Sequence, residues 1–470
     1  MAGHRIEKDS MGEMQVPAEA LYGASTQRAV LNFPISGIRF PREFIRALGL
    51  VKSAAAQANL ELGKLDATRA KLIAQAAEEV IEGKLDQHFP LDIFQTGSGT
   101  STNMNANEVI ANRCSQLAGK PIGSRDPVHP NDHVNMGQSS NDVIPTAIHI
   151  AAAESLRNSL VPALEGLRAA LDAKSKEFWD VIKIGRTHLM DATPIRLGQE
   201  FSGYAKQAEY AAARAQAAMA GLEELALGGT AVGTGLNCHP EFPGKVMRHL
   251  LARTGIAFRE AANHFEAQAA KDALVHASGS LKTIAVGLFK IANDLRWLSS
   301  GPRCGIGEIT LPETQPGSSI MPGKVNPVMS EALMQVCAQV IGNDATATWA
   351  GANGNLDLNV MMPVLAHNVL ESIRLLAAAA NVFRERCVTG IRANEKRCYE
   401  LVEYSMAMVT SLAPIIGYDK AAKIAKESAQ TGKTVREICR EQKILPEAEL
   451  EKALDPIEMT KPGGEGAAGG

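Results

Sequence analysis

One stretch of apolar residues repeats with a period that a long, packed helix satisfies. Its members alternate in spacing between three and four residues: Leu274, Ala277, Leu281, Ile284, Leu288, Ile291, Leu295 and Leu298. A heptad seam of this length is typical of helices that pack at a shallow angle. It lies in a predicted helix over residues 263–299, and a helix of about 30 residues is a rod about 45 Å long. The seam therefore favours a bundle of long helices.

Helical periodicity covers most of the remaining chain. The other windows predicted as helix are 43–63, 67–83, 103–118, 142–175, 195–224, 328–350 and 359–389, and Pro363 is expected to kink the last of them. Residues 1–42 are expected to form turns and short extended pieces, and residues 395–456 shorter helices. Rods of this length are hard to cover within one chain, so we expect a bundle that is shared between subunits.

Composition sets further bounds. The chain has 470 residues, too many for one ordinary core, and its net charge of −3 without a basic run argues against nucleic acid as a partner. Its seven cysteines are scattered without a CxxC pair, which predicts buried thiols in a reducing compartment and no zinc or Fe–S site. The N-terminus is polar and no run of 18 apolar residues occurs, so we expect a cytoplasmic protein without a membrane segment. The Gly-rich residues 461–470 are expected to be disordered.

Residues 317–327 carry the strongest functional signal, with the sequence Gly-Ser-Ser-Ile-Met-Pro-Gly-Lys-Val-Asn-Pro. Two glycines let the backbone approach a ligand, while hydroxyl groups and a lysine offer donors and a positive charge. Asn326 is expected to cap the following helix and Pro327 to be its first residue, so the positive end of that helix would favour a small anion. A phosphate-binding P-loop is excluded, because five residues separate the glycines and Val325 follows the lysine.

Two other segments also place hydroxyl groups before a predicted helix. These are Gln95–Thr102, with the sequence Gln-Thr-Gly-Ser-Gly-Thr-Ser-Thr, and Gln138–Asp142, with the sequence Gln-Ser-Ser-Asn-Asp. Each alone is explained by helix capping, with Ser140 or Asn141 as the cap of the second. Three such loops in one chain, one of which carries a lysine, favour convergence on a small polyanion such as a dicarboxylate.

Three further positions have a functional and a structural interpretation. His188 precedes Thr193-Pro194, the expected start of the 195–224 helix, and is either a titrating group or a surface histidine. Glu331 is either a functional carboxylate or a charge in the first turn of a helix. The cluster His129-Pro130-Asn131-Asp132 is either a binding segment or a turn with Asx hydrogen bonds.

Together these segments resemble the fumarase/aspartase superfamily. The 317–326 loop is similar to its signature loop, and the segments 95–100, 129–132, 138–142 and 185–188 resemble its other motifs in the same order, from about Arg5 to about Asp455. Within the superfamily the chain is most similar to the class II fumarases. Gly323 and Ser140 stand where the aspartate ammonia-lyases usually have Ala and Thr, and Thr96 and Ser98 replace small apolar residues.

The resemblance implies a fold, an assembly and a reaction. The fold would be mainly α, with three domains at 1–138, 139–394 and 395–470, and the central helices would form a twenty-helix core in a homotetramer with active sites shared between subunits. The reaction would be the hydration of fumarate to L-malate in the tricarboxylic acid cycle, through an aci-carboxylate intermediate. No metal and no organic cofactor are implied.

Site residues are carried over onto matching positions only. Ser318 would be the base that removes the carbon-bound proton, and His188, coupled to Glu331, would handle the proton of water. The implied substrate-binding residues are Ser98, Gly99, Thr100, Ser139, Ser140, Asn141, Thr187, Ser319, Lys324, Val325 and Asn326. A secondary dicarboxylate site is implied at His129, Pro130, Asn131 and Asp132.

Three departures from the family pattern accompany this assignment. Asp126 stands where the secondary site often has an arginine, with Arg125 beside it. Met190 replaces a usual Gln, and Met136-Gly137 replaces a common Lys-Ser. The rival predictions are an aspartate ammonia-lyase and a non-catalytic helical scaffold; Ser318, His188, Lys324 and Asn326 are all present, which argues against the scaffold.

Overall fold

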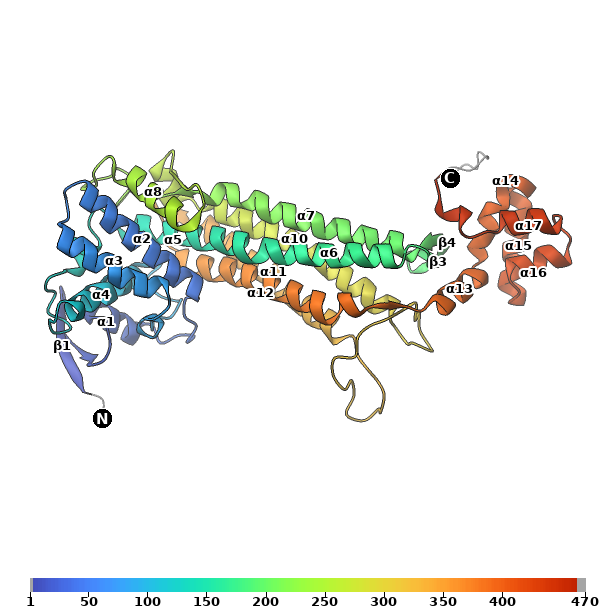
Figure 1. Ribbon diagram of the computed structural model, residues 1–470, viewed down its shortest axis with the longest axis horizontal. Helices are drawn as coiled ribbons and strands as arrows, with labels where there is room; N and C mark the ends of the chain where they lie inside the picture. Colours follow the sequence, from blue (N-terminus) through green and yellow to red (C-terminus); the bar gives the residue numbers. More distant parts are fainter. Residues whose placement is uncertain (1–2, 463–470) are drawn as a thin grey trace. The chain divides into compact units, whose positions relative to one another are not determined.

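The computed structural model describes residues 3–462, and its secondary structure is mainly helical, as predicted (Figure 1). The Gly-rich tail from residue 463 onward lies outside the described residues. The helices are α1 (Ala24–Asn32), α2 (Arg42–Glu61), α3 (Ala67–Ile81), α4 (Thr100–Leu117), α5 (Ser140–Ser155), α6 (Val161–Glu177), α7 (Leu197–Leu222), α8 (Phe242–Thr254), α9 (His264–Ala269), α10 (Asp272–Leu298), α11 (Val328–Ala352), α12 (Met362–Arg386), α13 (Glu395–Tyr404), α14 (Ala413–Ile416), α15 (Tyr418–Thr431), α16 (Val435–Glu441) and α17 (Glu447–Ala453).

The strands are short and pair two at a time. They are β1 (His4–Asp9) with β2 (Gly12–Pro17), β3 (Ile182–Thr187) with β4 (Met190–Arg196), β5 (Glu224–Leu225) with β6 (Arg259–Glu260), β7 (Ile309–Thr310) with β10 (Arg392–Ala393), and β8 (Gly354–Asn355) with β9 (Leu358–Asn359). All pairs are antiparallel except β5 with β6. The longer pairs therefore serve as local hairpins on a helical framework.

The chain divides into two compact units. Unit 1 comprises residues 1–162, 212–285 and 336–377, and unit 2 comprises residues 163–211, 286–335 and 378–470. The division cuts through α6, near its start, and through α7, α10, α11 and α12. The three domains at 1–138, 139–394 and 395–470 stay a prediction.

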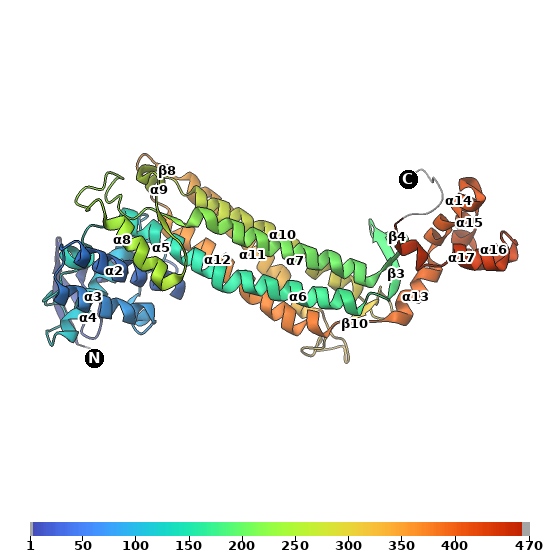
Figure 2. The same cartoon turned by 45° about the horizontal axis from the view of Figure 1, so that its top comes forward.

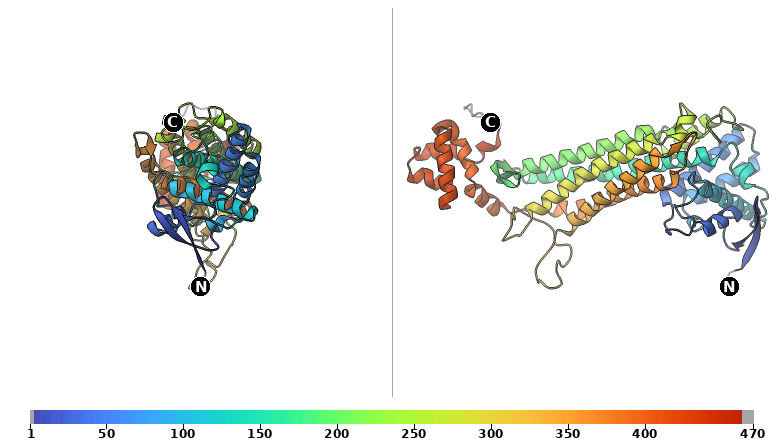
Figure 3. Two further views of the ribbon diagram at one scale, coloured as in Figure 1. Left: turned by 90° about the vertical axis from the view of Figure 1, so that its left-hand side faces the viewer. Right: turned by 180° about the vertical axis from the view of Figure 1, so that it is seen from behind.

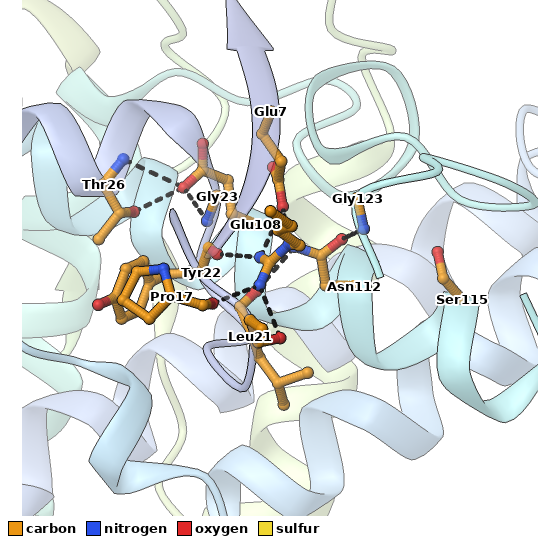
Figure 4. A network of polar contacts seen from close by, with 12 residues as sticks. Glu7, Pro17, Leu21, Tyr22, Gly23, Thr26, Glu108, Asn112, Ser115 and Gly123 are labelled. Carbon is orange, nitrogen blue, oxygen red and sulfur yellow. Dashed lines mark hydrogen bonds and ion pairs between the residues drawn. The ribbon is translucent and has the colours of Figure 1, made fainter. Parts of the chain in front are cut away.

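The N-terminal part of unit 1 is anchored by buried charge on α4 (Figure 4). The carboxylate of Glu108 accepts hydrogen bonds from the backbone N–H groups of Gly23, Ser25 and Thr26 and from the Thr26 hydroxyl, at 2.6–3.1 Å. One helical turn later, the Asn112 amide donates to the Leu21 carbonyl. The Glu108 carboxylate thus provides acceptors for the N–H groups at the start of α1, which lack partners within the helix itself.

The long helices pack as the heptad seam predicts (Figures 1 and 2). All eight seam residues of α10 are buried, none more than 6% exposed. Within unit 1, Ser278 of α10 donates to Asp344 of α11, and Asn343 of α11 donates to Ser372 of α12. Within unit 2, Tyr204 of α7 donates to Asp294 of α10. The prediction that the seam is buried among packed long helices is therefore confirmed.

The C-terminal helices of unit 2 enclose a core of their own, drawn in orange to red in Figure 3. Its buried members come from the β3–β4 hairpin and from α13 to α17: Ile184, Val402, Met408, Leu412, Ile424, Val435, Ile438, Cys439, Leu450 and Leu454. The hairpin that carries His188 is thus fixed at its base by apolar packing.

Some predicted helix boundaries are wrong. The 142–175 window contains a π-helix, Leu156–Leu160, between α5 and α6. The predicted helix over 263–299 is interrupted at Ala270. There the ammonium of the buried Lys271 donates hydrogen bonds to three backbone carbonyls. Pro363 is the second residue of α12, where no intrahelical N–H bond is lost, so it causes no kink. Thr193 and Pro194 belong to β4, and α7 begins later, at Leu197.

Candidate active site

The two ends of the 317–327 loop lie against each other at Gly317, where the backbone leaves no room for a side chain. A Cβ atom on Gly317 would lie 2.0 Å from the Lys324 carbonyl oxygen and 2.8 Å from the Asn326 nitrogen. The Asn326 side chain donates to the Gly317 carbonyl at 2.5 Å. Ser318 and Ser319 therefore begin the loop directly beside Lys324 and Val325, which end it.

The Ser318 hydroxyl occupies a nest of backbone donors. Its Oγ accepts hydrogen bonds from the N–H groups of Ile320, at 3.2 Å, and Met321, at 2.9 Å. Two N–H dipoles aimed at one oxygen stabilise negative charge on it. This geometry favours an alkoxide at Ser318 over an alkoxide at an ordinary surface serine.

The start of α11 agrees with the predicted 328–350 window, but Pro327 lies just before the helix rather than at its first position. The helix begins at Val328, and the Pro327 carbonyl accepts the bond from the Glu331 N–H group. Asn326 does not cap the helix, because its amide closes the loop instead. Glu331 lies in the first turn of α11, where its charge is favourable.

His188 is held in a strained turn. Thr187 pairs with Met190, so His188 and Leu189 form a two-residue hairpin turn between β3 and β4. Their φ angles are +58° and +61°, values that suit glycine or asparagine far better than histidine or leucine. Strain of this kind persists only where neighbouring structure fixes the backbone, and it concentrates at functional sites.

A buried cluster of charged residues holds strand β3 of this hairpin in place. The guanidinium of Arg186 donates to both oxygens of Glu308 at 3.0 Å, and the ammonium of Lys183 lies 3.2 Å from both Glu308 and Glu200. Glu308 is fully buried and Lys183 almost so. Burial raises the pKa of Glu200, and the charge of Lys183 opposes this shift. Sequence reasoning missed this cluster, although charged residues inside β3 were a visible signal.

His188 also lines an open cavity of about 770 Å³ in unit 2. Polar and charged side chains form much of its wall, among them Arg186, Gln199, Glu200, Tyr204, Lys290 and Asp294. The imidazole is therefore reachable from solvent and surrounded by hydrogen-bonding groups, as a proton-transfer group requires.

The Gln95–Thr102 loop of unit 1 leads directly into α4. Gly99 precedes the helix with φ +71°, and Thr100 is the first helical residue, three residues earlier than predicted. The hydroxyl groups of Ser98 and Thr100 are 2.8 Å apart and share a hydrogen bond. The loop thus presents paired hydroxyl groups at the positive end of an 18-residue helix.

The Gln138–Asp142 loop, also in unit 1, opens α5 with a capping box. Ser139, rather than Ser140 or Asn141, is the cap: its Oγ accepts from the Asn141 N–H group, while Asp142 accepts from the Ser139 N–H group. The Ser140 hydroxyl accepts a bond from Asn103 of α4 at 2.9 Å, and the Asn141 amide donates to the Ala231 carbonyl. Two of the predicted substrate-binding loops are therefore joined through α4.

The predicted secondary site forms a π-helical turn, Pro130–Val134. His129 Nδ1 accepts from the Asp132 N–H group at 3.2 Å, and Asn131 lies between them. Asp126 pairs with Lys120, and the Arg125 guanidinium donates to the Lys8 carbonyl. Dicarboxylate binding at this turn stays a prediction.

The predicted site residues fall into both units. Ser98, Gly99, Thr100 and Ser139, Ser140, Asn141 belong to unit 1, while Thr187, His188 and the 318–331 segment belong to unit 2. Within residues 3–462, no hydrogen bond or ion pair joins His188 to Ser318 or Glu331. The roles of these residues stay predictions.

Comparison with known proteins identifies the family. A model described as lyase matches residues 12–342, and one described as fumarase C C-terminus matches residues 408–461. A class II fumarate hydratase of Halobacterium salinarum is 59% identical over 98% of both chains, and one of Nitrosomonas europaea is 55% identical over 98% of this chain and 100% of its own. The chain belongs to the class II fumarate hydratase family.

Solved structures of this family share the fold. The class II fumarase of Schistosoma mansoni superposes with a TM-score of 0.95 at 40% identity, covering 98% of this chain and 100% of its own. A fumarate lyase:delta crystallin from Brucella melitensis, bound to cobalt, gives a TM-score of 0.94 at 47% identity over 98% of this chain and 100% of its own. The predicted fumarase/aspartase-like fold and the resemblance to class II fumarases are confirmed.

Residues 3–462 contain no group of three or more His, Cys, Asp or Glu side chains that could hold a metal ion. None of the helices in that range is long and apolar enough to span a bilayer.

Proposed function

We propose that this protein is a class II fumarate hydratase that catalyses the reversible hydration of fumarate to L-malate. The observation that carries the proposal is the full-length similarity to class II fumarate hydratases, 59% identical in the Halobacterium salinarum protein. The reaction belongs to the tricarboxylic acid cycle and makes the enzyme a hydro-lyase.

The difficult step is removal of a proton from carbon beside a carboxylate, because a second negative charge then develops on that carboxylate. Fixed donors and a cation can stabilise this charge, and one such donor is worth about 3 kcal/mol. On the 317–327 loop, Lys324, Asn326 and Ser319 would hold the carboxylate. Ser318 would accept the carbon-bound proton, a role that the two N–H groups on its Oγ support.

Addition and removal of water require a second proton-transfer group. His188, presented at a strained turn and lining a polar cavity, would serve this step together with Glu331. Thr187, Ser98, Thr100, Ser139, Ser140 and Asn141 would hold the two ends of the substrate. We also propose that His129 to Asp132 form a secondary dicarboxylate site.

We further propose a homotetramer with shared active sites, supported by the surface of α11. Between Ala332 and Trp349 the exposed positions of this helix carry no charge: Ala332, Gln335, Ala338, Gln339, Ile341, Gly342, Ala345, Thr346, Thr348 and Trp349. A helix without a charged face is normally covered by protein. Copies of this chain that cover it would let residues from different subunits meet at one site.

A cytoplasmic location completes the proposal. All seven cysteines are free thiols, and five of them are buried. Free thiols in this number suit a reducing compartment.

Incubation with L-malate, and separately with L-aspartate, tests the reaction through the ultraviolet absorbance of fumarate. We expect fumarate from malate only. Fumarate from aspartate alone would instead establish an aspartate ammonia-lyase.

Replacement of Ser318 tests its role as the base. Ser318→Ala should lower kcat by at least about 10²-fold with the oligomer intact by light scattering. The matched control is Ser411→Ala, since Ser411 donates only to the Met408 carbonyl, and it should keep full activity. A Ser318→Ala enzyme with near-normal turnover would exclude this residue as the base.

A further inference from the structure

Lys52 is a buried lysine of α2 whose ammonium makes no direct ion pair with any carboxylate of residues 3–462. It is 0% exposed, and its ammonium donates to the side-chain oxygens of Asn135 and Gln138, both at 3.0 Å. Burying a cation against neutral amides is unfavourable. The burial of Lys52 at this position therefore needs a physical explanation.

The partners of Lys52 lie directly before a predicted substrate-binding loop. Asn135 and Gln138 close the turn that leads into Ser139, and the Asn135 amide donates back to the Gln138 carbonyl. Asn59, seven residues after Lys52 on the same helix face, holds the same turn through the Met136 carbonyl. One buried face of α2 thus fixes the turn at several points.

The same network reaches the second loop of unit 1. The Asn135 side-chain oxygen also accepts from Asn103 and Asn107 of α4, at 3.2 Å each. Asn103 in turn donates to the Ser140 hydroxyl. Lys52 therefore connects, through Asn135 and Asn103, to the Ser139–Asn141 loop and to the helix that begins at Thr100.

The positive charge of Lys52 matters because the two loops beside it are otherwise uncharged. Residues 95–102 and 138–141 contain no charged side chain, while the fully buried Asp142 follows them and would repel a dicarboxylate. Lys52, bonded to the turn before the second loop and linked through Asn135 to α4, supplies the opposing positive charge. Asp142 is the charged group that acts on it.

We propose, on the basis of the proposed function, that Lys52 is a positioning residue for the dicarboxylate: it orders the Asn135–Gln138 turn and offsets the charge of Asp142 next to the binding loops. It touches the substrate only through these groups. Its removal should therefore weaken binding more than it slows the chemical steps.

The titration of Lys52 gives a signature that a purely structural lysine would lack. Burial lowers the pKa of Lys52 to about 7, with Asp142 opposing the shift. A bound dianion stabilises the protonated ammonium, so binding should draw a proton from solution above pH 7. At pH 6 the ammonium already carries that proton, so Lys52 should contribute no uptake there. Burial raises the pKa of Asp142 to about 6, so uptake at pH 6 belongs to that carboxylate.

Calorimetry with succinate, a saturated C4 dicarboxylate, measures this uptake in buffers of different ionisation enthalpy. We use the full-length His188→Asn enzyme, since that substitution removes the imidazole that is the proposed proton-transfer group of the site. We expect uptake approaching one proton at pH 8, and at pH 6 no uptake that depends on Lys52. Absence of uptake at pH 8 would overturn the proposal without needing any change at Lys52.

Substitution of Lys52 provides a second test of the proposal. Lys52→Met should raise the Kd of succinate and the KM of malate at least tenfold, with a smaller change in kcat, and should abolish the uptake. The matched control is Lys271→Met, which removes another buried lysine of unit 1 that contacts only backbone carbonyls; its KM should stay unchanged. Unaltered succinate affinity in Lys52→Met would refute the role. Failure of the wild-type enzyme to form fumarate from malate would refute the proposed function instead, because succinate binding needs no turnover.

Discussion

Two buried lysines show how the environment of a single residue decides its chemistry. Lys183 is 1% exposed and lies between Glu200 and Glu308, so its charge is compensated within 3.2 Å. Lys52 is equally buried but contacts only amide oxygens, and its pKa falls to about 7. Neutral partners compensate a buried charge less than carboxylates do, which is why burial lowers the pKa of Lys52 so far.

This difference predicts a pH dependence of stability. A lysine in an unfolded chain has a pKa of about 10.4, so between pH 7 and pH 10 the unfolded chain binds a proton that folded Lys52 lacks. Stability should therefore rise with pH across this window. Burial raises the pKa of Asp142 to about 6, so this carboxylate changes the pH dependence of stability only below pH 7. Thermal unfolding without dicarboxylate at pH 7 and pH 9 should show a smaller rise in the midpoint for Lys52→Met than for the wild type. Equal rises in the two proteins would contradict this.

Among elements, the buried face of α10 is predicted correctly from sequence, because its apolar residues follow the period of a long packed helix. All eight predicted seam residues are buried. The breaks were not predictable from periodicity: the π-helix at Leu156–Leu160 keeps apolar residues in phase, and the break at Ala270 depends on carbonyls captured by Lys271. Of the site, the sequence motifs revealed the loops, whereas the turn strain at His188 and the contacts of Lys52 depend on tertiary structure.

The seam of α10 also supports a prediction. Leu288→Ala removes a 1% exposed side chain from the packed face and should destabilise the protein by about 2–5 kcal/mol. Thr283→Ala, at an exposed position of the same helix, should change stability by no more than about 0.5 kcal/mol. Chemical denaturation at equal protein concentration compares the two. Similar midpoints for both variants would show that the seam contributes little.

For the whole molecule, the uncharged face of α11 is the feature that one chain does not explain. Small residues such as Ala338, Gly342 and Ala345 on that face would allow another helix to approach closely. Such a surface is stable in water only when covered. The proposed homotetramer follows from this physical requirement and from the family.

A charge placed on that face should disrupt the assembly. Ala345→Glu should lower the mass measured by light scattering below that of four chains and abolish activity, because the proposed sites need several subunits. Ala422→Glu, on an exposed face of α15 beside Lys423 and Lys426, should change neither. If Ala345→Glu remained a fully active tetramer, α11 would not lie at the interface.

The close contact between the two ends of the loop at Gly317 links the proposed roles of Ser318 and Lys324 to one movement of the loop. Since Asn326 is bonded back to Gly317, displacement of the loop would carry Ser318 and Lys324 together rather than one after the other. The proton acceptor and the cation that stabilises the resulting charge would then arrive at the substrate simultaneously. An alkoxide would never face the carbon acid without its electrostatic support.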